Sequence, residues 1–452
     1  MDRATIVYPA EPPRYPLYDE STLDDEKGWM INNVHDPAIF KDGDWYYVFS
    51  TDRQVGRETG DTPIRAGAQI RRSRNLIEWE WVGRAFDGVP EEAYCWTHAK
   101  TLWAPDCVKF GDTYYLYYVA SQFGKNQSFI GVATSSSPEG PWVDRGEVWK
   151  TKAGDVPNAI DPNIAFDRHG DPWMVYGSFF GGIYVSRIDP TTGKLVHYGE
   201  GTLIARRSQE LAGAVEGPYI VYNPAFDKYY LFVSYDSLFS DYNIRVGRSD
   251  SITGPYVDYN GHLLTDTEFR PQSEIGNKIA GSYAFANDDG WVAPGHNSVL
   301  KDGDDYFIVH HARGARRPEW SYLHVRRILW TPDGWPVVSP ERYAGEYEQR
   351  IPESAIPGRW EWIVFERSVN TKVLPVVLEF SKAGVVTGAG RNGEWKAVSA
   401  NGYQIRWDSG DLDYIRVLPA WDWENWCPTL VCTGLNQAGV SCWGKRIPEA
   451  KG

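Results

Sequence analysis

The chain has 452 residues, too many for one small core, which indicates two or three domains or one large repeat fold. Aromatic residues make up 15% of it, with 44 Gly, 29 Pro and only 3 Met, a composition typical of short strands joined by tight turns and therefore of an all-β protein. The net charge of -14 and the lack of any long basic run argue against a nucleic-acid partner.

The sequence gives no sign of a membrane partner. No apolar stretch approaches the roughly 20 residues that span a bilayer, and the N-terminus lacks the basic-then-apolar pattern of a signal peptide. We therefore expect a protein that is either cytoplasmic or exported with its signal removed.

Residues 1–30 are rich in proline and acidic side chains and show no sustained period, so we expect an extended arm lying on the following domain. A repeat begins directly after this arm. Each copy has a polar residue near its start, a short apolar run, a turn with Gly or Asp, and an aromatic run ending in small polar residues. This pattern predicts a strand, a hairpin turn and a second strand.

Five copies of the repeat open at Asp36, the Pro105-Asp106 pair, Asp161, Glu216 and His296. They are about 55 to 80 residues apart, which leaves room for four strands per copy. A sandwich would not need a motif at this long spacing, and a solenoid would show shorter, more regular repeats. We therefore predict a five-bladed β-propeller over residues 1–345, with the five opening residues near one mouth of its central channel.

The sequence pattern changes after residue 345, where the repeat ends. Residues 346–358 have the composition of a linker. Residues 359–452 contain short strands between Gly, Asn and Asp turns, which predicts a small all-β domain, either a barrel or a sandwich. Its Trp421, Trp423 and Trp426 could bind sugar, but we favour burial against the propeller, so that the domain braces it.

The chain has five cysteines, an odd number for a disulfide framework. Cys95 and Cys107 are far in sequence from the other three, and we expect the cysteines to be free, mostly buried thiols. Cys427, Cys432 and Cys442 are close in sequence, so one disulfide among them is an alternative. The lack of a fourth ligand nearby argues against a zinc site.

The opening residues differ from copy to copy, unlike those of a purely structural repeat. Carboxylates that converge on one pocket repel one another, which is costly unless they have a function. The simpler alternative is that Asp36 and Asp161 only cap strand entries, but Glu216 takes the same place in the fourth copy. Two carboxyl groups in an aromatic pocket fit glycoside hydrolysis, in which one acts as acid and the other as base or nucleophile.

Aromatic residues near the openers could stack on sugars. The candidates are Trp96, Trp103, Phe179 and Phe180, although packing between blades is the stronger explanation for each taken alone.

Six ordered motifs together resemble glycoside hydrolase family 43, specifically its endo-1,5-α-L-arabinanases. They are Val34-His-Asp-Pro37, Leu102-Trp-Ala-Pro-Asp106, Ala159-Ile-Asp-Pro162, Gly177-Ser-Phe-Phe-Gly-Gly182, Val215-Glu-Gly-Pro-Tyr219 and Gly295-His-Asn-Ser-Val299. The resemblance covers residues 30 to about 345, and the C-terminal segment resembles the small β-barrel of the longer arabinanases.

The resemblance implies an inverting enzyme that acts on arabinan. Asp36 matches the general base, Glu216 the general acid, and Asp161 the residue that orients the acid and tunes its pKa. His296 matches a channel histidine near a metal, usually a calcium ion held largely by water, although a hydrogen-bonded channel histidine is an alternative. The sugar-binding residues implied or expected are His35, Trp96, Trp103, Ser178, Phe179 and Arg313.

Two other functions stay open. One is an exo-acting α-L-arabinofuranosidase or β-xylosidase of the same family. The segments 53–67 and 91–100 differ from the sequence that is usual in the family, and they lie where loops shape the substrate cleft. The other is a sugar-binding propeller without catalysis, which the presence of all three carboxyl residues disfavours.

Overall fold

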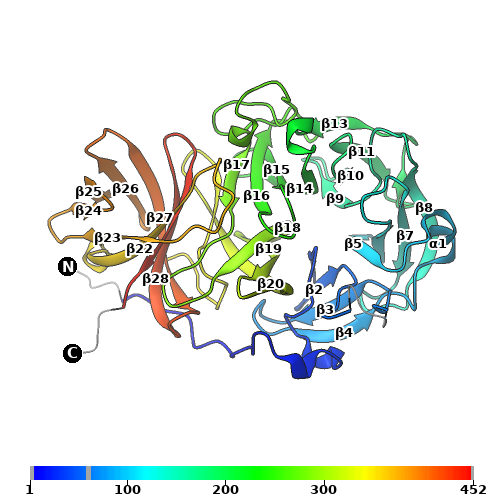
Figure 1. The fold of residues 1–452 in the computed structure, drawn as a ribbon, viewed down its shortest axis with the longest axis horizontal. Coiled ribbons are helices and arrows are strands. Elements are labelled where there is room, and N and C mark those ends of the chain that lie inside the picture. The colour runs from blue at the N-terminus through cyan, green and yellow to red at the C-terminus, as the bar shows by residue number, and fades with distance from the viewer. Residues whose placement is uncertain (1–4, 58–62, 449–452) are drawn as a thin grey trace.

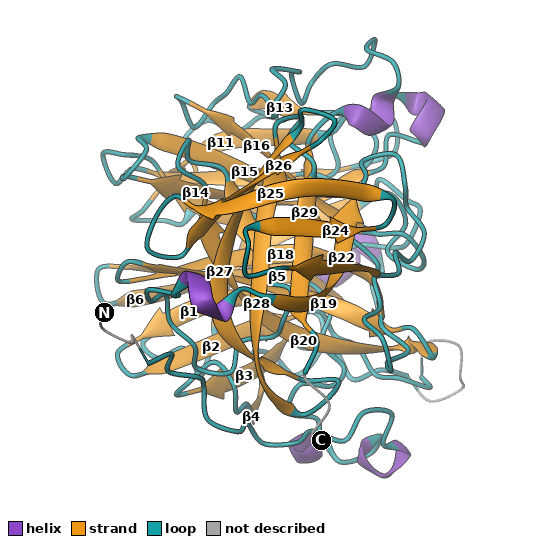
Figure 2. Ribbon diagram, turned by 90° about the vertical axis from the view of Figure 1, so that its left-hand side faces the viewer, coloured by secondary structure: helices purple, strands orange, loops and turns teal. Residues whose placement is uncertain are grey.

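The computed structural model describes residues 5–57 and 63–448 and confirms the all-β prediction. Five antiparallel sheets are arranged in a ring as the blades of a propeller, and a closed eight-stranded barrel lies at one side of it (Figure 1). The barrel faces the viewer in Figure 2. Of the loop 53–67, Glu58 lies outside the described residues.

The blades follow the chain in order, each from its inner to its outer strand. Blade 1 comprises β1 (Ala38–Asp42), β2 (Trp45–Ser50), β3 (Gln69–Ser73) and β4 (Glu80–Arg84). Blade 2 comprises β5 (Leu102–Phe110), β6 (Thr113–Ala120), β7 (Ser128–Ser135) and β8 (Val143–Thr151). Blade 3 comprises β9 (Asn163–Phe166), β10 (Pro172–Tyr176), β11 (Ile183–Asp189), β12 (Lys194–Leu195) and β13 (Thr202–Ala205).

Two more blades complete the ring. Blade 4 comprises β14 (Val215–Asn223), β15 (Lys228–Tyr235), β16 (Asn243–Ser249) and β17 (Asn277–Ala280). Blade 5 comprises β18 (Trp291–Asp302), β19 (Asp305–Gly314), β20 (Arg317–Trp330) and β21 (Pro336–Val338). The helical segments are α1 (Glu91–Thr97) and the short 3-10 turns η1 (Glu20–Thr22), η2 (Glu26–Gly28), η3 (Gln209–Leu211), η4 (Gln272–Glu274) and η5 (Glu353–Ala355).

Side chains on the inner strands tie neighbouring blades together. Asp106 on β5 accepts a hydrogen bond from the backbone N–H of Ile164 on β9, at 2.6 Å. Two similar bonds join other blades: Ile220 N–H donates to Asn163 Oδ1 at 3.0 Å, and Ile39 N–H donates to Ser298 Oγ at 3.1 Å. Asp106 is therefore a structural residue below the mouth.

The barrel is built from β22 (Gly358–Phe365), β23 (Val376–Phe380), β24 (Val385–Gly388), β25 (Arg391–Ala397), β26 (Gly402–Trp407), β27 (Leu412–Asp422), β28 (Cys427–Asn436) and β29 (Ser441–Arg446). Large rings such as Trp360, Trp362 and Phe380 belong to its buried core. Cys432 and Cys442 are buried free thiols on its adjacent strands β28 and β29.

The tryptophans between β27 and β28 lie against other parts of the chain. Trp423 Nε1 donates to the backbone oxygen of Arg342 at 2.9 Å, and Trp426 Nε1 donates to Glu11 of the N-terminal arm at 2.6 Å. Trp421 is only 6% exposed. This placement favours bracing over sugar binding. The arm itself packs Tyr18 on Trp320 of blade 5.

No helix in the described ranges is long and apolar enough to cross a bilayer.

Candidate active site

The opening residues of four repeats gather at the mouth of the channel in strained backbone conformations. Asp36, Asp161 and His296 have φ angles of 53°, 57° and 46°. Non-glycine residues rarely adopt this left-handed region, and such strain clusters at functional sites. In the fourth blade Gly217 carries the positive φ of 57°, and a side chain there would meet the His296 ring at 3.0 Å. Glu216 is thereby placed beside this ring.

Asp36 lies among histidines. Its Oδ1 is 2.8 Å from Nδ1 of His35 and 3.0 Å from Nδ1 of His296, and its backbone N–H donates to His311 Nδ1. The Thr51 hydroxyl donates to Oδ2 at 2.5 Å. Burial alone would raise the pKa of Asp36, but His35 and His296 hold it well below its usual range. Asp36 is therefore an ionised carboxylate at neutral pH.

Glu216 has the opposite environment. Its Oε2 accepts a hydrogen bond from the Ser178 hydroxyl at 2.8 Å, and its side chain is almost fully buried. Burial raises its pKa, while Ser178 and His296 act to lower it. A raised pKa is the property that a proton donor at neutral pH requires.

Asp161 is held directly behind the Glu216 backbone. Its Oδ2 accepts the N–H of Gly217 at 3.0 Å. Burial raises its pKa to about 7; His296 opposes this shift, and the nearby Glu216 and Asp36 reinforce it. The two buried carboxyls thus compete for a proton, and the bond to Gly217 ties Asp161 to the backbone beside Glu216.

His296 contacts the groups on both sides of the mouth. Its backbone N–H donates to Ser234 at 2.7 Å, and its ring lies between Asp36 and Gly217. Burial acts to lower its pKa, but Asp36 and Asp161 raise it to about 9. In this structure the ring therefore carries positive charge among the carboxyls.

His35 and Arg313 extend the Asp36 cluster, and both are buried. Arg313 Nη2 is 3.2 Å from His35 Nε2, and its Nε and Nη1 donate to the backbone oxygens of Leu238 and Pro318. Burial lowers the pKa of His35 to about 4, so this ring is neutral despite its contact with Asp36. His35 thus contacts Asp36 directly, and Arg313 contacts His35; their role in sugar binding stays a prediction.

The predicted sugar-binding residues are spread out. Phe179 has a φ of 50° and donates its N–H to Val215 O at 2.8 Å, directly beside Glu216. Trp103 at the start of β5 bonds Thr101 through Nε1 at 3.1 Å. Trp96 on α1 donates to Thr151 O at the end of the outer strand β8, so the structure does not bring it to the carboxyls. Ser178 contacts Glu216, so its hydroxyl is already engaged with the acid.

Sequence reasoning missed Thr51, Ser234 and His311. A signal for the first two was present, because the second strand of a blade ends in small polar residues at Ser50-Thr51, Ser178 and Ser234. These hydroxyls all bond an opening residue. His311 stacks on His35 at 3.7 Å between centroids and has no comparable sequence signal.

The comparisons with known proteins agree with this geometry. The family model described as glycosyl hydrolases family 43 matches residues 30–336, more than half of the chain. The chain belongs to glycosyl hydrolase family 43. A second family model, a C-terminal lipocalin-like domain, matches residues 340–444 and covers the barrel.

Several relatives of this family 43 member are arabinan-degrading enzymes. An extracellular endo-α-(1->5)-L-arabinanase of Thermotoga petrophila is 33% identical over 93% of this chain and 94% of its own. Its crystal structure in complex with TRIS has a TM-score of 0.82, with 93% of this chain and 99% of that chain covered. An extracellular exo-α-(1->5)-L-arabinofuranosidase of Cellvibrio japonicus is 32% identical over 71% of this chain and 90% of its own.

A sugar complex is known among the similar structures. The α-L-arabinanase of Cellvibrio cellulosa with arabinohexaose has a TM-score of 0.58 at 31% identity and covers 68% of this chain and 96% of its own. The chain is thus an arabinanase-like glycoside hydrolase of family 43.

Proposed function

We propose that this enzyme hydrolyses α-1,5-linked L-arabinofuranosyl chains with inversion of configuration. The observation that carries the proposal is the contrast between two buried carboxyls at one mouth: Asp36 contacts two histidines that lower its pKa, whereas burial raises the pKa of Glu216. Inverting hydrolysis needs such a base and acid on opposite faces of the sugar. The names of the similar enzymes supply the substrate class.

The residues would act in a single displacement. Asp36 removes a proton from a water molecule as the water oxygen attacks the anomeric carbon. The glycosidic C–O bond breaks, and the leaving oxygen takes the proton of Glu216. Asp36 ends protonated and Glu216 ionised, and exchange with solvent restores both. Asp161 keeps the acid in position through Gly217.

Endo action is the mode that we propose, because the Thermotoga relative is similar over nearly the full length of both chains. Exo action is the second candidate, favoured by the Cellvibrio japonicus relative, which is similar over the propeller.

A calcium ion near His296 belongs to this proposal and comes from the family resemblance. The next residue, Asn297, is 2% exposed, and neither of its amide atoms has a hydrogen-bond partner among the described residues. Calcium takes six to eight oxygen ligands, and a protonated imidazole cannot ligate a metal. The Asn297 oxygen would therefore be a direct ligand, water would fill most other positions, and His296 would donate to such a water. A separate set of ligand atoms from His35, Asp36 and His311 lies within 4.8 Å, but it is rich in nitrogen and suits calcium poorly.

Hydrolysis of debranched arabinan tests the function. We expect reducing sugars to be released, proton NMR to show the first product as the inverted β-anomer, and mixed oligomers to appear early in the digest. A retained anomer would contradict the assignment of Asp36 as base, and a single short product would show exo action. Dialysis against a chelator should lower both activity and melting temperature, with recovery on adding calcium.

A further inference from the structure

A groove with a volume of about 610 Å³ opens beside the catalytic acid on the same face of the propeller. Its walls come from the β8–β9 segment, the β10–β11 loop, the β13–β14 segment and the β16–β17 segment. The residues that line it include Asp155, Val156, Phe180, Arg206, Arg207, Glu268 and Arg270. The volume lies within the range of small-molecule sites, roughly 300 to 1,000 Å³.

Two walls of the groove are the segments that hold Glu216. Phe180 follows Ser178 and Phe179, which bond the Glu216 carboxyl and the Val215 carbonyl. On the other wall, Arg207 donates to Ala214 O at 3.0 Å. The groove therefore begins on the side of the acid, whereas Asp36 lies on blade 1. Because the acid protonates the oxygen of the leaving group, the leaving part of a substrate chain departs toward this groove.

The groove presents the groups that bind sugars. The Phe180 side chain is 43% exposed although its residue is held at a strained φ of 35°. Val156, which lies against the adjoining Gly181, is 60% exposed. Strain that keeps an apolar ring in solvent has no benefit for folding, and a flat ring with one free face is suited to stacking on a sugar.

Arg206 supplies an uncommitted polar group. The guanidinium is exposed and makes no hydrogen bond or ion pair with any residue that the structure describes. Arg270, by contrast, pairs with Glu210 at 2.9 Å. Arg207 pairs with Asp236, and the acidic residues Asp155 and Glu268 balance the other two arginines of the groove, so a neutral ligand fits better than an anion. The planar N–H groups of Arg206 could donate to neighbouring sugar hydroxyls.

We propose that this groove binds the sugar units of the leaving-group side of the arabinan chain, beyond the unit next to the cleaved bond, with Phe180 stacking and Arg206 donating hydrogen bonds. The inference rests on the proposed function. It makes the length of the leaving portion a determinant of the rate.

The test measures hydrolysis of arabinotriose and of arabinohexaose labelled at its reducing end. It compares the wild-type enzyme with the variants Phe180→Ala and Arg206→Ala. Loss of one stacking or hydrogen-bonding contact should lower kcat/KM for the hexaose about tenfold, mainly through KM, and leave the triose within about twofold. The cleavage position should also shift toward the labelled end, because the variants no longer favour long leaving portions.

Phe166→Ala is the matched control. Phe166 ends β9 at the opposite face of blade 3 and is 40% exposed, close to the exposure of Phe180, so its removal should change neither substrate. Equal losses on triose and hexaose, unchanged kinetics, or a shift of cleavage away from the label would each overturn the groove assignment while the wild type still hydrolyses both. If the wild type hydrolyses neither oligosaccharide, the proposed function and the groove assignment fall together.

Discussion

Neighbouring side chains give the catalytic carboxyls their different roles. Asp36 and Glu216 are both buried, and burial alone would raise the pKa of each. Two imidazoles and the Thr51 hydroxyl on Asp36 overcome that effect, whereas the Ser178 hydroxyl and the nearby His296 ring do not overcome it at Glu216. The side chains that touch each carboxyl therefore shift the two pKa values in opposite directions, as the proposed base and acid require.

Replacing Glu216 by Ala tests the acid directly. We expect kcat to fall about 10²- to 10⁴-fold on arabinan, because the leaving oxygen loses its proton donor. An aryl arabinofuranoside with a very good leaving group should lose much less, since its leaving oxygen needs little protonation. Asp36→Ala serves as comparison and should lose activity on both substrates. Equal losses for Glu216→Ala would refute its role as acid.

Ser178 should set the pH at which the acid ionises. Its hydroxyl bonds the Glu216 carboxylate and lowers the pKa of that group, so Ser178→Ala should raise the pKa. Activity is lost as pH rises through this pKa, because the acid must be protonated. The alkaline limb of kcat/KM should therefore move up by about one pH unit. Ser178→Thr keeps a hydroxyl and should restore the limb. An unmoved or lowered limb in Ser178→Ala would contradict this account.

At the scale of the elements, the inner strands divide their polar residues between catalysis and closure of the ring. Asp36, Asp161 and Glu216 lie at the strand entries, while Asp106 lies farther along β5 and bonds Ile164 N–H and Asn163 Nδ2 on the next blade. A carboxyl that belongs to the repeat is thus no proof of a catalytic role.

Asp106 should matter for stability. Asp106→Ala leaves the buried Ile164 N–H without a partner, so we expect the free energy of unfolding to fall by about 1–3 kcal/mol. Asp106→Asn keeps the acceptor and should remain near the wild type. Denaturant unfolding measures both, with kcat as a second readout. The idea fails if Asp106→Asn, well folded, loses activity as Asp36→Asn should.

The pH dependence of stability follows from the same burial, which raises the pKa of Asp106 to about 7 in the folded protein. The unfolded carboxyl ionises near pH 3.9, so folding takes up a proton between these values. Its contribution to stability is therefore greatest below about pH 4 and declines as the pH rises to 7. Asp106→Asn should remove this contribution to the slope of the free energy of unfolding against pH. An unchanged slope would contradict the raised pKa of Asp106.

The propeller could be predicted because each repeat has a recognisable local sequence pattern: a strand, a turn, a second strand and then a small hydroxyl residue. The positions of Asp36, Asp161 and Glu216 follow from the same repeat. The contacts of His311 and Thr51 with Asp36 could not be predicted, because register and side-chain direction decide which polar atoms meet at the mouth. The sequence suggested Phe180 as a stacking residue, but it could not predict the groove around it, since four separate segments build that groove.

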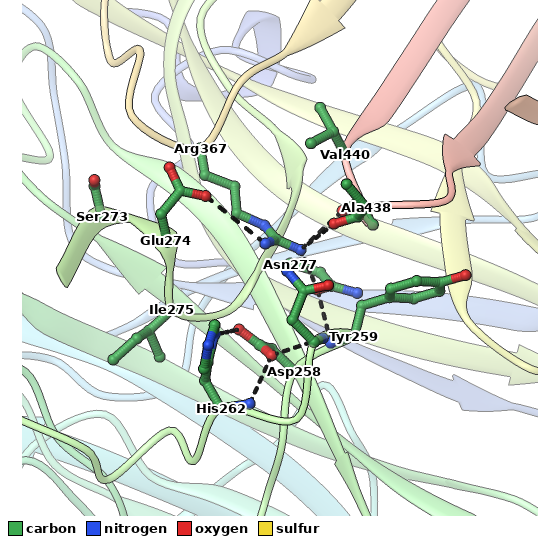
Figure 3. A network of polar contacts seen from close by, with 12 residues as sticks. Asp258, Tyr259, His262, Ser273, Glu274, Ile275, Asn277, Arg367, Ala438 and Val440 are labelled. Carbon is green, nitrogen blue, oxygen red and sulfur yellow. Dashed lines mark hydrogen bonds and ion pairs between the residues drawn. The ribbon is translucent and has the colours of Figure 1, made fainter. Parts of the chain in front are cut away.

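At the scale of the whole molecule, the barrel is joined to blade 4 by a polar network (Figure 3). Arg367, which follows β22, has a buried side chain that donates to Asn277 Oδ1 on β17 at 3.0 Å. It also donates to the backbone oxygens of Ala438 and Gly439 in the β28–β29 turn. One guanidinium thus connects both domains, which agrees with a barrel that braces the propeller.

Arg367→Ala should therefore weaken the whole molecule more than the barrel alone. The buried carbonyls and Asn277 lose their donor, so we expect the free energy of unfolding to fall by about 3 kcal/mol. Calorimetry should show the barrel and propeller transitions moving apart. Arg367→Lys keeps the charge without the forked geometry and should lie between. Arg391→Ala is the control, because Arg391 is exposed and its guanidinium lies over Trp407 of the barrel. If Arg367→Ala is no more destabilising than Arg391→Ala, the network does not brace the propeller, because a buried donor shared between domains must cost more than an exposed one.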